Sequence, residues 1–221
     1  MTQVKTVIFD MDGLMFATED IYYKANQETA DKLGMDFSFE VYAQFIGMGD
    51  EDSQAKMYDL YEDKELVDEF FDKSTTVSEY LLLNGPVDLQ PGLIELLEYL
   101  EQEKIPAVVA SSTHRKLVDQ LLDRLDVRKY FKDAVGGDEV KHTKPDPAIF
   151  NKAFSKTGVQ AKENALILED SKNGVLAAYG AGIPVIMIPD LLEADEEVQE
   201  KALAIMPDLT AVISYIEEKN N

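Results

Sequence analysis

Two aspartates stand one residue apart at the end of an apolar run, in the segment TVIFDMDGLM at residues 6–15. Carboxylate oxygens are preferred ligands of Mg²⁺, and a carboxylate can also attack phosphorus or carry a proton. Asp10 and Asp12 are therefore candidates for a metal ligand, a nucleophile and an acid or base. Taken alone, the pair is equally compatible with a simple turn after a strand.

Other polar side chains follow further apolar runs. Ser111 and Ser112 come after PAVVA (106–110), and Glu169 and Asp170 end and follow NALILE (164–169). Ligands of parallel sheets bind beyond the carboxyl ends of the strands, so we expect these side chains to converge.

A lysine completes a set that could bind a phosphoryl group. Lys144 lies in the loop sequence KHTKPDP. Mg²⁺ would lie between Asp10 and Asp170. The three phosphoryl oxygens would then be surrounded by this ion, the Lys144 ammonium, the Ser111 hydroxyl and backbone N–H groups near Ser112.

Alternating apolar runs and helical patterns predict the elements that position these residues. Five runs read as strands, the last of them weaker: VKTVIF (4–9), PAVVA (106–110), NALILE (164–169), PVIMI (184–188) and DAVGG (133–137). Helical spacing covers residues 92–103, 115–125, 147–158 and 173–182. This alternation predicts an α/β fold with a parallel sheet.

A helical insertion separates the first run from the rest. Residues 16–84 contain no convincing strand and carry aromatic side chains at helical spacing, which we expect to form a core of their own. We predict an α/β domain of residues 1–15 and 85–221, with an all-α cap of residues 16–84.

Four motifs together resemble the haloacid dehalogenase superfamily, in the branch with an inserted helical (C1) cap, which includes sugar-phosphate phosphatases and β-phosphoglucomutase. The motifs are FDMDG, VVASS, KPDPAIF and LEDSKNG, in this order along the chain. The resemblance covers the whole chain and implies a Rossmann-like three-layer core and a Mg²⁺-dependent reaction.

The resemblance also implies a role for each motif residue. Asp10 would be the nucleophile that forms an aspartyl-phosphate, and Asp12 the general acid and base and a Mg²⁺ ligand through its backbone carbonyl. Asp170 would be the remaining metal ligand. Ser111, Ser112 and Lys144 would bind the phosphoryl group, while Glu169 would act through water or by orienting Lys144.

Departures from the family pattern bear on the reaction. The mutase pattern has a histidine where this chain has Tyr22, and a basic residue in the segment that resembles GMGDEDS (47–53), where this chain has Asp50. Both departures favour hydrolysis over phosphosugar mutation. Ala17 stands where the family usually has a further aspartate, which leaves a non-catalytic sensor of phosphorylated ligands as a third hypothesis.

Three residues at the cap entrance are candidates for substrate contact: Thr18, Glu19 and Tyr22. Thr18 is equally compatible with a helix N-cap, with Glu19 in the first turn. A histidine in a loop is more often a surface residue, so we expect His114 to be non-catalytic.

The charge balance restricts the partners. With 43 acidic and 21 basic residues, the formal net charge of −22 disfavours nucleic acids and anionic membranes. The chain has no cysteine and no apolar run long enough to span a bilayer. We expect a cytoplasmic monomer that acts on a small phosphorylated metabolite.

Overall fold

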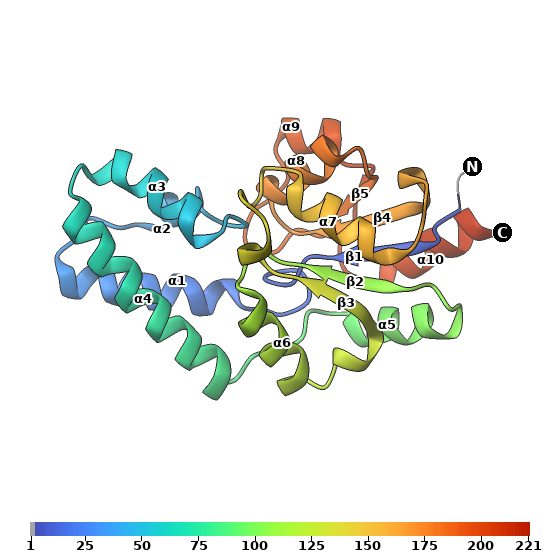
Figure 1. Cartoon of the computed structure of the whole chain (residues 1–221), viewed down its shortest axis with the longest axis horizontal. Helices are drawn as coiled ribbons and strands as arrows, with labels where there is room; N and C mark the ends of the chain where they lie inside the picture. The colour runs from blue at the N-terminus through green and yellow to red at the C-terminus, as the bar shows by residue number, and fades with distance from the viewer. Residues whose placement is uncertain (1–2) are drawn as a thin grey trace.

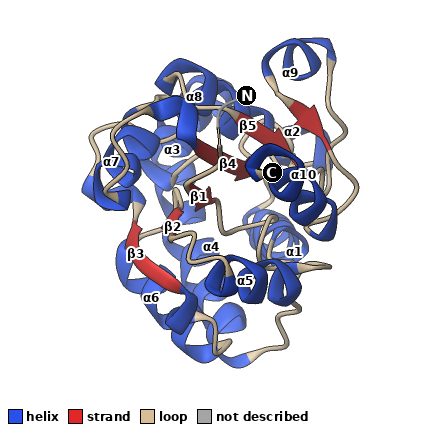
Figure 2. Ribbon diagram, turned by 90° about the vertical axis from the view of Figure 1, so that its right-hand side faces the viewer, coloured by secondary structure: helices blue, strands red, loops and turns tan. Residues whose placement is uncertain are grey.

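The computed structural model describes residues 3–221 and contains a parallel six-stranded sheet with helices on both faces (Figures 1 and 2). The strands in chain order are β1 (Thr6–Phe9), β2 (Ala107–Ala110), β3 (Phe131–Val135), β4 (Ala165–Glu169), β5 (Val185–Met187) and β6 (Ala204–Ile205). Their order across the sheet is β3-β2-β1-β4-β5-β6, and every neighbouring pair is parallel. The order reverses beside β1, and ligands of such sheets bind at that point.

The central strands are largely apolar, apart from Thr6 in β1 and Glu169 in β4, because helices cover both of their faces. Val7 and Phe9 of β1 belong to one apolar cluster, while Ile8 belongs to the other. The first cluster is completed by α5 (Leu93–Gln102), α6 (Arg115–Arg124) and α10 (Thr210–Asn220). The second is completed by α7 (Ala148–Thr157), α8 (Lys172–Ala181) and Val198 of α9 (Glu196–Lys201). The predicted three-layer α/β fold is thereby confirmed.

All five predicted strands are present, but their bounds and number differ from the prediction. The run DAVGG predicts a strand over 133–137, whereas β3 spans Phe131–Val135. The strand ends before the glycines because Gly137 donates its N–H to the Thr113 carbonyl and begins a 3₁₀ turn, Gly137–Glu139. β6, α9 and α10 were not predicted.

Residues 19–84 form four helices that lie beyond one end of the sheet (Figure 1). These are α1 (Glu19–Leu33), α2 (Phe39–Tyr42), α3 (Asp50–Tyr61) and α4 (Lys64–Asn84). They enclose a separate apolar cluster that includes Met35, Phe37, Met57 and Phe70. We call these helices and their connections the cap. The division into domains at residues 15–16 and 84–85 stays a prediction.

Within residues 3–221, no helix is both long enough and apolar enough to cross a lipid bilayer. Two further 3₁₀ turns, Arg128–Tyr130 and Lys162–Asn164, precede β3 and β4.

Candidate active site

A buried lysine lies at the carboxyl ends of the central strands, between two acidic side chains. Lys144 is fully buried in the loop before α7, and its ammonium donates to Asp10 and, at 2.6 Å, to Glu169. Burial alone would lower the pKa of this ammonium, but the charges of Asp10 and Glu169 outweigh burial and raise it. Lys144 therefore stays protonated, as a buried cation must be paired to be tolerated.

Glu169 is held in place by the start of α8. Its Oε2 accepts hydrogen bonds from the N–H groups of Asp170 and Ser171 and from the Ser171 hydroxyl, each at 3.1 Å. Gly174 makes this close approach possible, because a Cβ there would lie 1.8 Å from the Glu169 carboxyl carbon. Glu169 thus fixes the position of the Lys144 ammonium.

Three carboxylates converge beside this lysine. Asp10, Glu169 and Asp170 each offer an oxygen, and these three oxygens lie within 4.8 Å of one another. Asp170 Oδ1 is buried without a hydrogen-bond partner. Gly13, at φ +78°, lets the chain pass close to Asp170, because a Cβ there would lie 2.2 Å from Asp170 Oδ2.

The electrostatics of this cluster fit a bound cation. Burial raises the pKa of Asp10 to about 8, against the opposing effect of Lys144. Burial, followed by the charges of Glu169 and Asp10, raises the pKa of Asp170 well above its usual range. One ammonium does not neutralise three buried carboxylates, so the donor set fits a hard divalent ion such as Mg²⁺.

The Asp12 carboxylate is not part of this cluster, because three hydroxyl groups hold it. Thr18 Oγ1 donates to Asp12 Oδ1 at 2.9 Å, while Ser111 Oγ and Thr113 Oγ1 donate to Asp12 Oδ2 at 3.1 and 2.8 Å. Thr18 occupies the N-cap position of α1 without a side-chain capping bond. The predicted N-cap position of Thr18, with Glu19 in the first turn, is therefore confirmed, but its hydroxyl donates to the Asp12 carboxyl group instead of accepting a helix N–H.

Thr113 is a site residue that the sequence analysis missed. Ser111 and Thr113 both reach Asp12, whereas Ser112 Oγ donates to the Gly47 carbonyl in the cap at 3.0 Å. Side chains two residues apart in an extended segment lie on the same side. The hydroxyl run SST after β2 could have indicated this pairing of its first and third residues.

A cavity lies over these residues and extends into the cap. Asp10, Asp12 and Lys144 line its floor, and Ser112, Glu19 and Tyr22 line its side. Glu19 is buried and accepts a 2.5 Å hydrogen bond from the Tyr42 hydroxyl, and burial raises the pKa of Glu19 to about 8.

Two residues named in the sequence analysis lie away from the chemistry. The His114 imidazole is exposed at the edge of the cavity, with Nδ1 3.9 Å from an Asp138 oxygen. Ala17 contributes only its backbone, donating its N–H to the Asp88 carbonyl at 2.9 Å.

The cap also touches the loop that carries Lys144. Thr143 donates its N–H and its hydroxyl to Asp52 Oδ2 at 2.9 and 2.7 Å, and it accepts the Gly49 N–H at 3.0 Å. Asn173 adds a 2.7 Å bond to the Ile46 carbonyl. The residue beside Lys144 is thus joined directly to α3.

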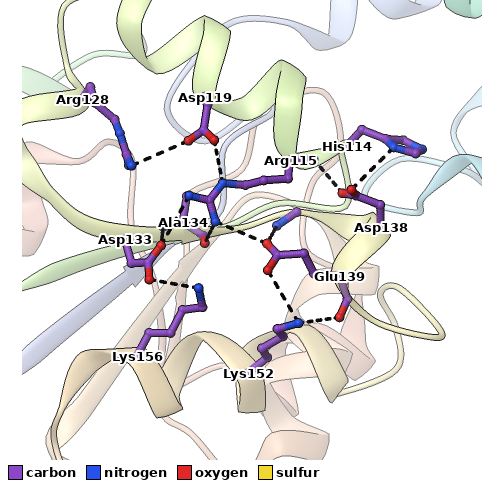
Figure 3. A network of polar contacts seen from close by, with 11 residues as sticks. His114, Arg115, Asp119, Arg128, Asp133, Ala134, Asp138, Glu139, Lys152 and Lys156 are labelled. Carbon is purple, nitrogen blue, oxygen red and sulfur yellow. Dashed lines mark hydrogen bonds and ion pairs between the residues drawn. The ribbon is translucent and has the colours of Figure 1, made fainter.

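A network of ion pairs surrounds Arg115, which begins α6 after the loop that follows β2 (Figure 3). The Arg115 guanidinium bonds to the Ala134 carbonyl and to Asp119 at 2.8 Å, and its backbone N–H donates to Asp138 at 2.7 Å. Asp133 and Glu139 each lie 3.4 Å from the same guanidinium. This network ties the start of α6 to the end of β3 and so restrains residues 111–113.

Comparison with known proteins agrees with the fold and the motifs. The family model described as haloacid dehalogenase-like hydrolase matches residues 7–188. A phosphorylated carbohydrates phosphatase of Thermotoga maritima is 33% identical over 185 residues, 81% of this chain and 82% of the relative. (DL)-glycerol-3-phosphatase 2 of Arabidopsis thaliana is 30% identical over 202 residues, 83% of this chain and 79% of the relative.

A solved structure is also similar over nearly the whole chain. CbbY from Rhodobacter sphaeroides, in complex with phosphate, has a TM-score of 0.80 and 26% identity, covering 95% of this chain and 96% of that chain. The sequence match over residues 7–188 and the shared fold lead to one assignment. This chain belongs to the haloacid dehalogenase-like hydrolase family.

Proposed function

We propose that this protein is a Mg²⁺-dependent phosphatase that hydrolyses a small phosphorylated metabolite, a sugar or polyol phosphate, through an aspartyl-phosphate on Asp10. The observation that carries the proposal is the buried group of Asp10, Lys144, Glu169 and Asp170 at the floor of a cavity. The similarity to phosphatases of Thermotoga maritima and Arabidopsis thaliana supports the class of reaction.

Asp10, Asp170 and the Asp12 backbone carbonyl would hold the Mg²⁺, and Glu169 lies close enough to act on the same site. When bound, the ion supplies positive charge at the phosphoryl oxygens. Lys144 supplies a second positive charge from the protein, and the Ser111 hydroxyl supplies a hydrogen-bond donor. Burial of the group excludes water and strengthens these interactions.

In the first step, an Asp10 oxygen forms a bond to phosphorus while the bond from phosphorus to the leaving oxygen breaks. Asp12, protonated, gives its proton to that leaving oxygen, which departs as an alcohol. The Ser111 hydroxyl must turn from Asp12 to the phosphoryl group when substrate binds. Thr113 and Thr18 then remain to hold Asp12.

In the second step, a water molecule attacks the phosphorus of the aspartyl-phosphate. Asp12, now a carboxylate, takes a proton from that water, and the bond between phosphorus and the Asp10 oxygen breaks. Inorganic phosphate and the original Asp10 and Asp12 protonation states result, so the cycle balances.

The cavity favours hydrolysis over mutation of a phosphosugar. A mutase must bind a second phosphate, yet Asp50 lines the cavity near its mouth where the mutase pattern has a basic residue. Tyr22 lines the cavity where that pattern has a histidine.

Turnover of p-nitrophenyl phosphate with and without Mg²⁺ tests the proposal. We expect Mg²⁺-dependent release of p-nitrophenolate that Asp10→Asn abolishes. Asp59→Asn is the matched control, because it makes the same exchange at an exposed position of α3. Full activity of Asp10→Asn would refute the assignment of Asp10 as the nucleophile. An inactive wild-type protein would favour the hypothesis of a non-catalytic sensor. Glucose 6-phosphate formed from β-glucose 1-phosphate with a bisphosphate primer would favour the mutase.

A further inference from the structure

The cavity is much larger than a phosphoryl group needs. Its empty space, including open solvent at the mouth, is about 1040 Å³. Asp10 and Lys144 lie at its floor, and α1, α3 and α4 contribute to its walls. The cap therefore leaves room for a sizeable leaving group.

The cap contributes an apolar surface to the cavity, beside polar residues such as Asn26, Ser53 and Thr75. Phe37, Met57 and Phe70 line the cavity and are buried, and the Phe37 and Phe70 rings lie 5.4 Å apart. Phe71 extends this surface, with its ring 5.6 Å from that of Phe70 in an edge-to-face arrangement. The Ser78 hydroxyl donates to the Ser74 carbonyl of its own helix, so it offers the cavity little polarity. Such walls favour contact with a ring over contact with a flexible polyol.

In the described part of the chain, the cavity offers no spare lysine or arginine for a second anionic group, and the His114 imidazole in its lining already lies 3.9 Å from an Asp138 oxygen. Within residues 3–221, Lys144 is the only lysine or arginine that lines it, and Lys144 is already paired with Asp10 and Glu169. At the mouth the lining includes two exposed carboxylates, Asp50 and Glu79. A second phosphate or a carboxylate on the substrate would meet like charge there.

We infer that the cavity selects phosphate monoesters whose leaving group is uncharged and carries an aromatic or other apolar ring, and that it rejects esters with a second phosphate or a carboxylate. This inference rests on the proposed function for its reaction but narrows the substrate away from acyclic polyol phosphates, and binding alone can test it. Burying one face of a ring against the partly exposed Phe71 is expected to improve affinity about 10-fold.

Calorimetric titration of phosphate esters into the Asp10→Asn protein, in the presence of Mg²⁺, measures this selectivity without turnover. The probes are uridine 5′-monophosphate, sn-glycerol 3-phosphate and fructose 1,6-bisphosphate. We expect the uridine ester to bind at least about 10-fold more tightly than glycerol 3-phosphate and about 100-fold more tightly than the bisphosphate. Equal or tighter binding of the bisphosphate would overturn the inference.

Two substitutions assign the selectivity to named residues. Glu79→Lys should strengthen bisphosphate binding about 10-fold, whereas Glu65→Lys, the same exchange at an exposed position of α4 outside the cavity, should change it less than about 2-fold. Phe71→Ala should weaken binding of the uridine ester about 10-fold and leave glycerol 3-phosphate unaffected. Equal responses of Glu79→Lys and Glu65→Lys would contradict the role of charge at the mouth.

Parallel turnover assays on the wild-type protein separate this inference from the proposed function. The predicted binding order without hydrolysis of any probe would support the selectivity and refute the phosphatase. Hydrolysis with the reverse order would support the phosphatase and refute the selectivity.

Discussion

Replacing Thr113 by valine tests whether its hydroxyl holds Asp12 for proton transfer. The bond from Thr113 Oγ1 to Asp12 Oδ2, at 2.8 Å, is the shortest of the three that Asp12 accepts from hydroxyl groups. A hydrogen bond to a charged group contributes about 1.5–3 kcal/mol. Both side chains are partly exposed, and Thr18 still donates to Asp12 after Ser111 turns to the phosphoryl group, so we expect a loss of ~1–2 kcal/mol, or about a 5- to 30-fold fall in kcat.

Rapid mixing with p-nitrophenyl phosphate shows which step the substitution affects. p-Nitrophenolate leaves without a proton, so transfer of the phosphoryl group to Asp10 does not need Asp12, whereas attack by water does. In Thr113→Val we expect a burst of about one equivalent of p-nitrophenolate, followed by slower turnover. The kcat/KM for this ester should stay unchanged while kcat falls, and Thr113→Ser should restore kcat.

A different pattern would refute this reasoning. If Thr113→Val lowers kcat/KM for p-nitrophenyl phosphate as strongly as kcat and gives no burst, Thr113 only shapes the cavity. If Thr113→Ser is as impaired as Thr113→Val, the hydroxyl is not the group that matters. Unfolding temperatures of both variants show whether either change disturbs the fold.

Three further predictions concern the buried acids and the helix that supports them. Asp170→Asn should abolish the rise in unfolding temperature with Mg²⁺, and it should stabilise the metal-free protein by ~1–3 kcal/mol because one of three neighbouring carboxylates is lost. Scanning fluorimetry with Mg²⁺ or EDTA measures both effects. An unchanged response to Mg²⁺ would contradict this prediction. The pKa of Glu19 is about 8 in the fold against an ordinary 4.5, so the folded state keeps a proton that the unfolded state loses, and stability falls as pH rises from 4.5 to 8. Urea unfolding of metal-free Glu19→Gln should show a shallower decline than wild type, by up to ~1.4 kcal/mol per pH unit, and parallel curves would exclude this effect. Gly174→Ala should destabilise the protein by about 1–3 kcal/mol and abolish turnover, because the new Cβ would displace Glu169. Gly180→Ala in the same helix is the control, since its Cβ would meet only ordinary contacts at 3.6 Å or more. Equal effects of the two substitutions would argue against a clash with Glu169.

The sheet could be predicted from the sequence because its central strands are buried on both faces. TVIF is apolar after its first residue and ALILE before its last, which is the pattern of strands covered by two layers of helices. β6 has only two residues, Ala204 and Ile205, and Ile205 is exposed, so no apolar period marks it.

The meeting of Asp10, Lys144 and Asp170 was also predictable, because Asp10 and Asp170 directly follow strand ends and Lys144 lies in the loop between β3 and α7 at the same edge of the sheet. The hydrogen-bond partner of each hydroxyl group could not be predicted from the sequence. Thr18 could bind either a free N–H of α1 or the Asp12 carboxylate, and only the position of the Asp12 side chain decides between them.

The central claim is that the Asp10 carboxylate takes the phosphoryl group, and trapping that species tests it most directly. Wild-type protein with Mg²⁺ and substrate is quenched in acid within one turnover, digested and mapped by mass spectrometry. The account predicts one added phosphoryl group on the peptide that contains Asp10, labile to hydroxylamine and absent from Asp10→Asn. A phosphoryl group on another residue, or hydrolysis at full rate in Asp10→Asn, would contradict it.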